Sequence, residues 1–244
     1  MSGEKILIIH PYDKTTIFLD SIKTNLDSSF KNDVFCFNVQ LNDNSHKECL
    51  ERIEKHPKNG LIIFLGHGKP STLSGSKGDE YSPSISLEEI YKYPELYYFN
   101  ENFINKENIK VFSGKKVFCL ACNSKEKIAD FAIENGVETY LGFGNIPSSK
   151  EEFKLAGVTN VSNEIVALMK SELTYIIMKS IEYSIFKSYT FEQLHNILQF
   201  IINQRISYIL TSKKDFEERY ILADYLYYLK KEVAIFGNKH NLLL

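Results

Sequence analysis

The 244-residue sequence contains little cysteine and no tryptophan: it has four cysteines in all. Four cysteines in a chain of this length do not form the disulfide framework of a small secreted domain. A chain this long can instead bury most of its unfolded surface in an ordinary apolar core. We therefore expect a reducing, cytoplasmic compartment.

Long apolar runs and a strong net charge are also missing. No stretch approaches the roughly 18 apolar residues of a membrane-spanning helix. The richest region, 173–186, is interrupted by Lys179 and Glu182. The amino terminus lacks the apolar region and cleavage site of a signal peptide. The formal net charge of −2 gives no overall attraction to nucleic acid or anionic lipid. The sequence therefore predicts neither membrane nor direct nucleic-acid binding.

Short apolar runs alternate with helical patterns over the first 145 residues. The runs predicted to be strands are 5–10, 33–39, 61–65, 116–120 and 137–141. The segments predicted to be helices between them include 15–26, 47–55 and 125–134. Near-continuous apolar strands between amphipathic helices are typical of a parallel sheet covered on both faces. The predicted fold class is α/β, with a doubly wound, mostly parallel sheet flanked by helices.

Two regions depart from this alternation. The stretch 69–114 begins with a loop rich in Ser and Gly, and residues 86–89 (SLEE) have the capping-box pattern of a short helix. From about residue 158 the pattern is helical, with another capping box at 190–193 (TFEQ) before an apolar stripe that predicts core packing. We assign a main domain at 1–212 and a helical extension at 213–244 packed on the same domain.

Two reactive side chains follow neighbouring predicted strands. His67 comes directly after the strand at 61–65, and Cys122 follows the strand at 116–120. Ligands bind outside the carboxyl ends of strands in open α/β sheets, so a His and a Cys there can reach one substrate bond. The glycines beside His67 let the backbone approach a substrate and leave the Gly68 N–H free to face it. We expect Cys122 at a helix N-terminus, which would lower its thiol pKa.

These motifs resemble those of CHAT-type cysteine peptidases, members of the caspase, separase and gingipain clan. The segments that carry the resemblance are LIIFLGHG (61–68), SISLEEIYKY (84–93), KKVFCLACNS (115–124), GVETYLGFGNIP (136–147) and YTFEQLHNILQFIINQRI (189–206). The resemblance covers roughly residues 5–210. The sequence departs from the family pattern at Phe143, where CHAT proteins usually have Trp, and in the longer stretch before the Cys strand.

The resemblance implies that Cys122 attacks the scissile carbonyl and that His67 acts as acid and base, with no third residue required and no metal or cofactor. It implies that the Gly68 N–H, together with that of Cys122, stabilises the oxyanion. Asp13 lies in the loop that shapes the specificity pocket in such enzymes, where a carboxylate favours a basic substrate residue. A charge at the start of the following helix is the alternative interpretation of Asp13.

The resemblance further implies a regulated effector in a bacterial defence or cell-death system, with a protein substrate and an activating or regulatory partner protein. We expect the segment 69–114 to take part in that regulation. Two other function classes remain open: a catalytically silent CHAT-like scaffold, and a flavodoxin-like binding domain, although 10–13 (HPYD) has no phosphate-cradling glycine. The pair Cys119-x-x-Cys122 also allows a redox or zinc site.

Overall fold

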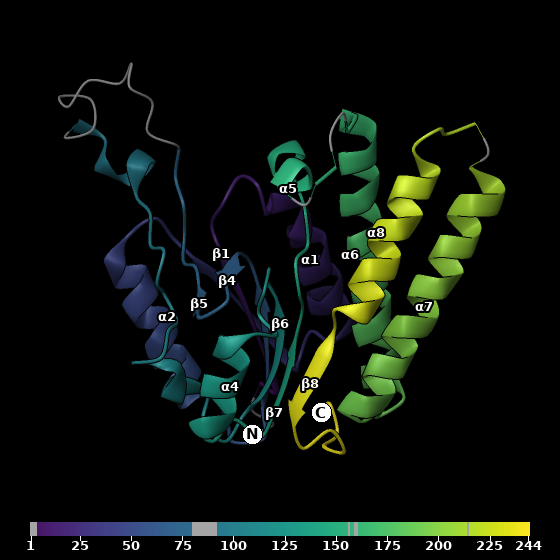
Figure 1. The fold of residues 1–244 in the computed structure, drawn as a ribbon. Coiled ribbons are helices and arrows are strands. Elements are labelled where there is room, and N and C mark those ends of the chain that lie inside the picture. The colour runs from purple at the N-terminus through teal and green to yellow at the C-terminus, as the bar shows by residue number, and fades with distance from the viewer. Residues whose placement is uncertain (1–3, 80–91, 156, 159–160, 214) are drawn as a thin grey trace.

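The computed structural model describes residues 4–244 except 80–91, 156, 159–160 and 214. Its centre is a six-stranded sheet in the order β2-β1-β3-β6-β7-β8 (Figure 1). The strands are β1 (Ile6–Pro11), β2 (Val34–Val39), β3 (Leu61–Leu65), β6 (Lys116–Leu120), β7 (Thr139–Gly142) and β8 (Ala234–Gly237). All neighbouring pairs are parallel except β7 and β8. A separate hairpin joins β4 (Gly68–Lys69) to β5 (Thr72–Leu73).

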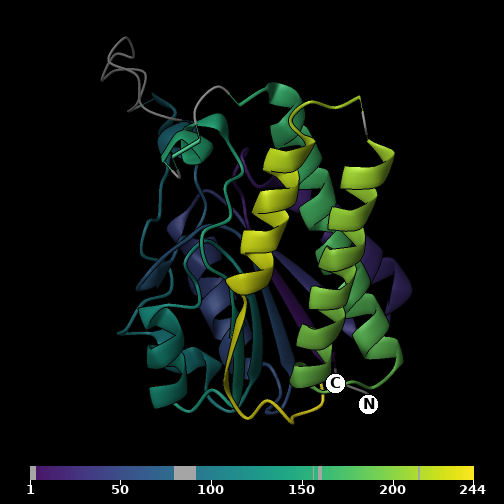
Figure 2. The same ribbon diagram turned by 45° about the vertical axis from the view of Figure 1, so that its right-hand side comes forward.

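Helices cover both faces of the sheet, as Figures 1 and 2 show. The α-helices on one side are α1 (Asp20–Ser29), α6 (Asn163–Phe186), α7 (Phe191–Ser212) and α8 (Arg219–Lys231), and on the other side α2 (Asp43–Lys55) and α4 (Lys127–Glu134). The shorter helices are η1 (Ile17–Leu19), η2 (Pro94–Tyr97), η3 (Ile109–Phe112) and α5 (Lys150–Leu155). The predicted doubly wound fold with a helical C-terminal part is confirmed.

Strand β3 shows how the sequence produces two cores. Leu61, Ile63 and Leu65 pack with side chains of α1 and α6, whereas Ile62 and Phe64 pack with those of α2 and α4. Successive side chains of a strand point to opposite faces of its sheet. A strand with apolar residues at every position therefore needs a helical layer on each side, and all five of these residues are fully buried.

The loop after β1 delays the first helix. The sequence predicted a helix at 15–26, but η1 begins at Ile17 and α1 at Asp20. Upstream, the Asp13 carboxylate accepts hydrogen bonds from the Thr15 N–H and from the Thr15 hydroxyl, both at 2.7 Å. Such local side-chain bonds stabilise a turn in competition with a helix. The turn matters for function because it places Asp13 and Thr15 beyond the carboxyl end of β1.

The C-terminal region is helical but also completes the sheet. The capping box predicted at 190–193 is confirmed at the start of α7, whereas that at 86–89 lies outside the described residues. The segment 213–244 was predicted as a helical extension and contains α8, followed by β8. Because β8 pairs with β7 as the sixth strand, this segment is an integral part of the sheet.

The described parts of the stretch 69–114 form a two-stranded ribbon instead of the predicted loop. We define the ribbon as residues 73–79 and 96–104, which run side by side beyond the hairpin β4–β5 (Figure 1). The Leu73 N–H donates to the Ile104 carbonyl at 2.8 Å, and the Gly75 N–H donates to the Asn100 carbonyl at 2.7 Å. The ribbon therefore begins within a few residues of His67.

Candidate active site

The carboxyl ends of β1, β3 and β6 meet at one edge of the sheet, and each leads to a predicted site residue. Asp13 follows β1, His67 follows β3 and Cys122 follows β6. The strand order reverses between β1 and β3, and ligands bind at such a reversal in open α/β sheets. The structure thus brings the three side chains to the region where this fold builds its binding sites.

The loop after β1 holds His67. Its Nε2 lies 2.7 Å from the Thr15 hydroxyl and 3.4 Å from Oδ2 of Asp13. Asp13 is only 7% exposed, and its other carboxylate oxygen is taken by Thr15. Because both oxygens of Asp13 are occupied within the protein, the geometry favours a positioning role over the substrate-binding role that the sequence predicted.

The charge of Asp13 determines which nitrogen of His67 carries a proton. Burial raises the pKa of Asp13, but hydrogen bonds from His67 and Thr15 outweigh burial and lower it to about 2. The ionised carboxylate only accepts hydrogen bonds, so it takes the one hydroxyl proton of Thr15. The Thr15 oxygen then accepts from Nε2 of His67. In the neutral imidazole this leaves the Nδ1 lone pair free to accept a proton.

The low pKa of Asp13 predicts a pH-dependent contribution to stability. The folded-state value of about 2 lies below the ordinary 3.8, so the ionised carboxylate stabilises the fold above about pH 4, and this contribution is lost as the pH falls to 2. We expect the wild-type chain to exceed Asp13→Asn by about 2 kcal/mol in unfolding free energy at neutral pH. Denaturant titrations at stepped pH should show this difference shrinking toward zero near pH 2; a constant difference would contradict the assignment.

Cys122 lies in a tight turn between β6 and α4. Asn123 beside it has φ 55°, in the left-handed region, and its N–H donates to the Gly144 carbonyl at 2.9 Å. The Cys122 thiol donates to the Ile146 carbonyl at 3.3 Å. Burial, assisted by the nearby Glu152 carboxylate, raises the pKa of Cys122 to about 12. The resting group is therefore a thiol.

The prediction that a helix N-terminus lowers the pKa of Cys122 is wrong. Helix α4 begins at Lys127 with Glu126 as its N-cap residue, so the turn 123–126 separates Cys122 from the helix. The influence of a helix dipole falls off within its first turn. Burial of the sulfur raises the pKa of the thiol instead.

Gly68 packs directly against the Cys122 turn. A Cβ atom on Gly68 would lie 2.7 Å from the Cys122 carbonyl oxygen, so only glycine fits. In the hairpin, Gly68 faces Leu73, and the neighbouring Ser74 N–H donates to the His67 carbonyl at 3.0 Å. Hydrogen-bonded and non-bonded pairs alternate in an antiparallel ladder. The Gly68 N–H therefore points away from β5, as a donor to a substrate oxygen must.

His67 and Cys122 line the same hollow, together with Thr16, Leu19 and Leu173 among others. Both side chains belong to the described part of the chain, and no hydrogen bond joins them. The space open to a water-sized sphere is about 20 Å³, which holds roughly one water molecule. The hollow beside the two side chains is therefore narrow.

The alternative of a shared Cys119 and Cys122 site does not fit the geometry. Cys119 is fully buried among side chains that pack with α2 and α4, whereas Cys122 packs with the core on the opposite face. Two thiols directed to opposite faces of one sheet are poorly placed to share a metal ion or form a disulfide. Among the described residues, no group of three or more His, Cys, Asp or Glu side chains could hold a metal ion.

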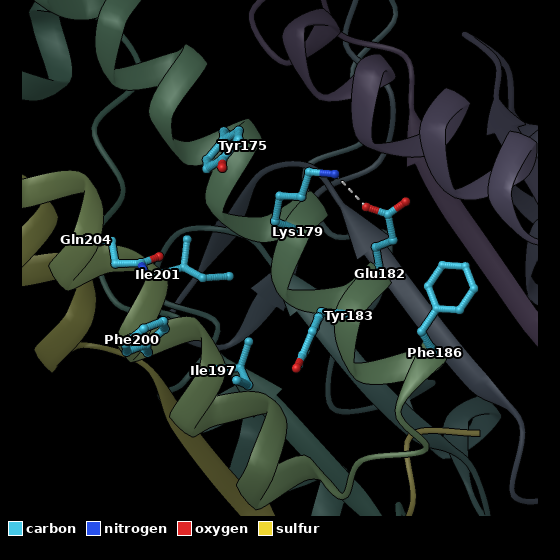
Figure 3. Close-up of a pocket in the computed structure, with 9 residues that line it drawn as sticks. All are labelled: Tyr175, Lys179, Glu182, Tyr183, Phe186, Ile197, Phe200, Ile201 and Gln204. Atoms are coloured by element: carbon cyan, nitrogen blue, oxygen red, sulfur yellow. Dashed lines mark hydrogen bonds and ion pairs between the residues drawn. The ribbon is translucent and has the colours of Figure 1, made fainter. Parts of the chain in front are cut away.

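A wider groove of about 420 Å³ lies between α6 and α7 (Figure 3). Its lining side chains are Tyr175, Lys179, Glu182, Tyr183, Phe186, Ile197, Phe200, Ile201 and Gln204. The lining contains neither cysteine nor histidine, and Lys179 pairs with Glu182 at 2.8 Å. Because this groove lacks the cysteine and the histidine that thiol chemistry needs, the smaller hollow at the strand ends is the candidate active site.

No protein-family model and no curated protein matches the chain. Within the residues that the structure describes, no helix is both long and apolar enough to cross a membrane.

Proposed function

We propose that the protein is a caspase-like cysteine endopeptidase of the CHAT type that cleaves specific protein targets through His67 and Cys122. The observation that carries the proposal is their placement in one hollow, at the carboxyl ends of the adjacent strands β3 and β6. Asp13 and Thr15 support it, because they engage Nε2 of the histidine and leave Nδ1 for the thiol proton.

In the proposed reaction, the Cys122 thiol passes its proton to Nδ1 of His67 as Sγ attacks the scissile carbonyl carbon. The N–H groups of Gly68 and Cys122 stabilise the tetrahedral oxyanion. Collapse of this intermediate breaks the C–N bond, and His67 gives its proton to the leaving amine. His67 then takes a proton from water as the water oxygen attacks the thioester carbonyl carbon. The C–S bond breaks, the acid product leaves as a carboxylate with its proton lost to solvent, and His67 returns its own proton to Sγ to restore the thiol.

In this proposal the enzyme is restrained in its resting state. The thiol is bonded to the Ile146 carbonyl, and the hollow has space for about one water molecule. Activation then consists of opening the hollow and turning the thiol toward His67, by substrate or by an activating partner protein. Such restraint suits a cytoplasmic effector of a bacterial defence or cell-death system, the role that the resemblance implies. The four cysteines are all unpaired, as a reducing compartment requires.

The same restraint favours a second candidate, a catalytically silent CHAT-like interaction module. A thiol whose pKa is raised to about 12 is a weak nucleophile until its surroundings change. A flavodoxin-like binding domain fits less well although the parallel strands have that order. The loop after its first strand would have to bind phosphate, and here it carries the ionised Asp13.

A covalent probe separates the two candidates. The purified chain is treated with peptide chloromethyl ketones, with and without the products of neighbouring genes, and its intact mass is measured. An enzyme gains one adduct on Cys122, and His67→Ala greatly slows its formation. The absence of an adduct under every condition, with a folded chain, would support the silent module and contradict the peptidase.

Thr15 is predicted to position His67 in the reaction. Thr15→Val removes the hydroxyl that bonds both His67 and Asp13 while keeping the side-chain shape. We expect kcat to fall about tenfold, the value of one hydrogen bond, with KM little changed. Thr15→Ser is the matched control and should restore most of the rate, as steady-state peptide cleavage can measure. Equal rates for Thr15→Val and the wild type would remove Thr15 from the mechanism.

A further inference from the structure

One fully buried serine of the ribbon joins four parts of the fold. The Ser76 hydroxyl donates to the carbonyl of Val39 at 2.6 Å and accepts from the N–H of Tyr12 at 3.2 Å. Its own N–H donates to Nε2 of His46 at 3.0 Å, and its carbonyl accepts from Asn100 at 3.1 Å. The ends of β1 and β2, helix α2 and both arms of the ribbon thus meet at one residue.

The contact at Tyr12 bears directly on the candidate site. Tyr12 donates its N–H to Ser76 and to the Val39 carbonyl, and its own carbonyl accepts from Lys77 at 2.7 Å. Asp13, the next residue, is the group that engages Thr15 and His67. Both backbone groups of the residue before Asp13 are therefore held in part by the ribbon.

The fit between the ribbon and helix α2 is too close to be a loose surface contact. A Cβ atom on Gly75 would lie 2.2 Å from Nε2 of His46. The ring of His46 also packs edge-on against Phe103 with 4.8 Å between centroids, and Nδ1 lies 2.8 Å from the Asn42 carbonyl. These contacts hold the ribbon against α2 at the point where the Ser76 hydroxyl meets Tyr12.

We propose that Ser76 is a positioning residue that acts through the backbone of Tyr12 to hold Asp13 and Thr15 against His67. The ribbon is then part of the machinery that orients the histidine, and a protein bound to it can change the rate at the site. This inference rests on the proposed function, because it assigns His67 a catalytic orientation. It adds a buried residue, 63 positions after Asp13, whose hydrogen bonds within the described part of the chain go to Tyr12, Val39, His46 and Asn100.

The test compares Ser76→Ala with Ser74→Ala in the full chain. Ser74 is a matched control because it lies on the same arm and is buried, and its hydroxyl donates to the Glu101 carbonyl at 3.4 Å within the ribbon. We expect Ser76→Ala to lower kcat about 10-fold with KM unchanged, and Ser74→Ala to retain the wild-type rate. If thermal melting shows that Ser76→Ala is not folded, Ser76→Cys, which keeps the side-chain size, is used in its place.

A double-mutant cycle separates positioning from a merely structural effect. If Ser76 acts through the loop, its loss has little further effect once Thr15→Val has removed the contact with His67. Multiplicative losses from Ser76→Ala and Thr15→Val would overturn the inference, as would equal rates for Ser76→Ala and Ser74→Ala.

A spectroscopic readout distinguishes failure of the inference from failure of the proposed function. Nitrogen-15 NMR at alkaline pH reports which ring nitrogen of His67 carries the proton, whether or not the protein cleaves peptides. We expect an Nε2-protonated ring in the wild type and in Ser74→Ala, and a mixture of the two tautomers in Ser76→Ala. If the wild type shows this pattern but cleaves no peptide, the proposed peptidase function is refuted and the positioning role of Ser76 stands. An unchanged tautomer in Ser76→Ala would refute the positioning alone.

Discussion

Cys122→Ala is expected to abolish peptide-bond cleavage, with a loss in kcat of more than about 10³-fold, because no other group at the strand ends can form the thioester. Cys122 lines the hollow with His67 and lies beyond the end of β6, outside the strand. Removing the sulfur should therefore leave the fold intact. Cleavage of a peptide library by the activated protein, with thermal melting of each variant, measures both effects.

Cys119→Ala is the matched control for this substitution. It removes the same atom from the same strand region, but Cys119 is fully buried on the opposite face and its sulfur cannot reach a substrate in the hollow. We expect Cys119→Ala to keep at least a third of the wild-type rate and to lose a little thermal stability, because removal of the sulfur leaves a cavity. If Cys119→Ala and Cys122→Ala are both folded and lose cleavage equally, the reaction must take place at a site that uses both thiols.

The sequence predicted the sheet best where strands are buried on both faces. The predicted bounds of β3 and β6 match the structure, because β3 is a continuous apolar run and β6 is one after its first residue, Lys116. Strand β8 was missed because it has four residues, lies at an edge and is only partly buried, so its pattern is no different from that of a loop. Its pairing with β7 is decided by tertiary packing.

The site could be predicted in position but not in chemistry. The rule that ligands bind at strand ends was enough to bring His67 and Cys122 together. The contact between Thr15 and His67 was missed, because it depends on a turn that returns the hydroxyl to His67, 52 positions later. The available sequence signal for this contact was the carboxylate of Asp13, two residues before Thr15, in the loop that follows β1. The protonated state of Cys122 follows from its burial and from the nearby Glu152 carboxylate, 30 positions away, and no local pattern reveals either.

The helical layer on one face of the sheet contains a buried ion pair. Glu172 of α6 accepts two hydrogen bonds from Arg205 of α7, at 2.6 and 2.7 Å. The Glu172 side chain is 6% exposed and that of Arg205 is 23% exposed. The guanidinium group also lies 4.3 Å from the centroid of the Tyr208 ring. Such two-pronged geometry satisfies both carboxylate oxygens and sets how α6 and α7 pack together.

Arg205→Met is expected to destabilise the protein by about 3 kcal/mol, because it leaves the Glu172 carboxylate buried without a partner. In a chain of this length that loss corresponds to a melting temperature roughly 10 °C lower. The matched control is Lys179→Met, which breaks the more exposed pair with Glu182 on the same helix and should cost less than about 1 kcal/mol. The double variant Glu172→Met/Arg205→Met removes both charges and should recover most of the stability. Thermal and denaturant unfolding of the three variants measures this order, and an Arg205→Met chain as stable as Lys179→Met would show that the pair contributes little to holding α6 against α7.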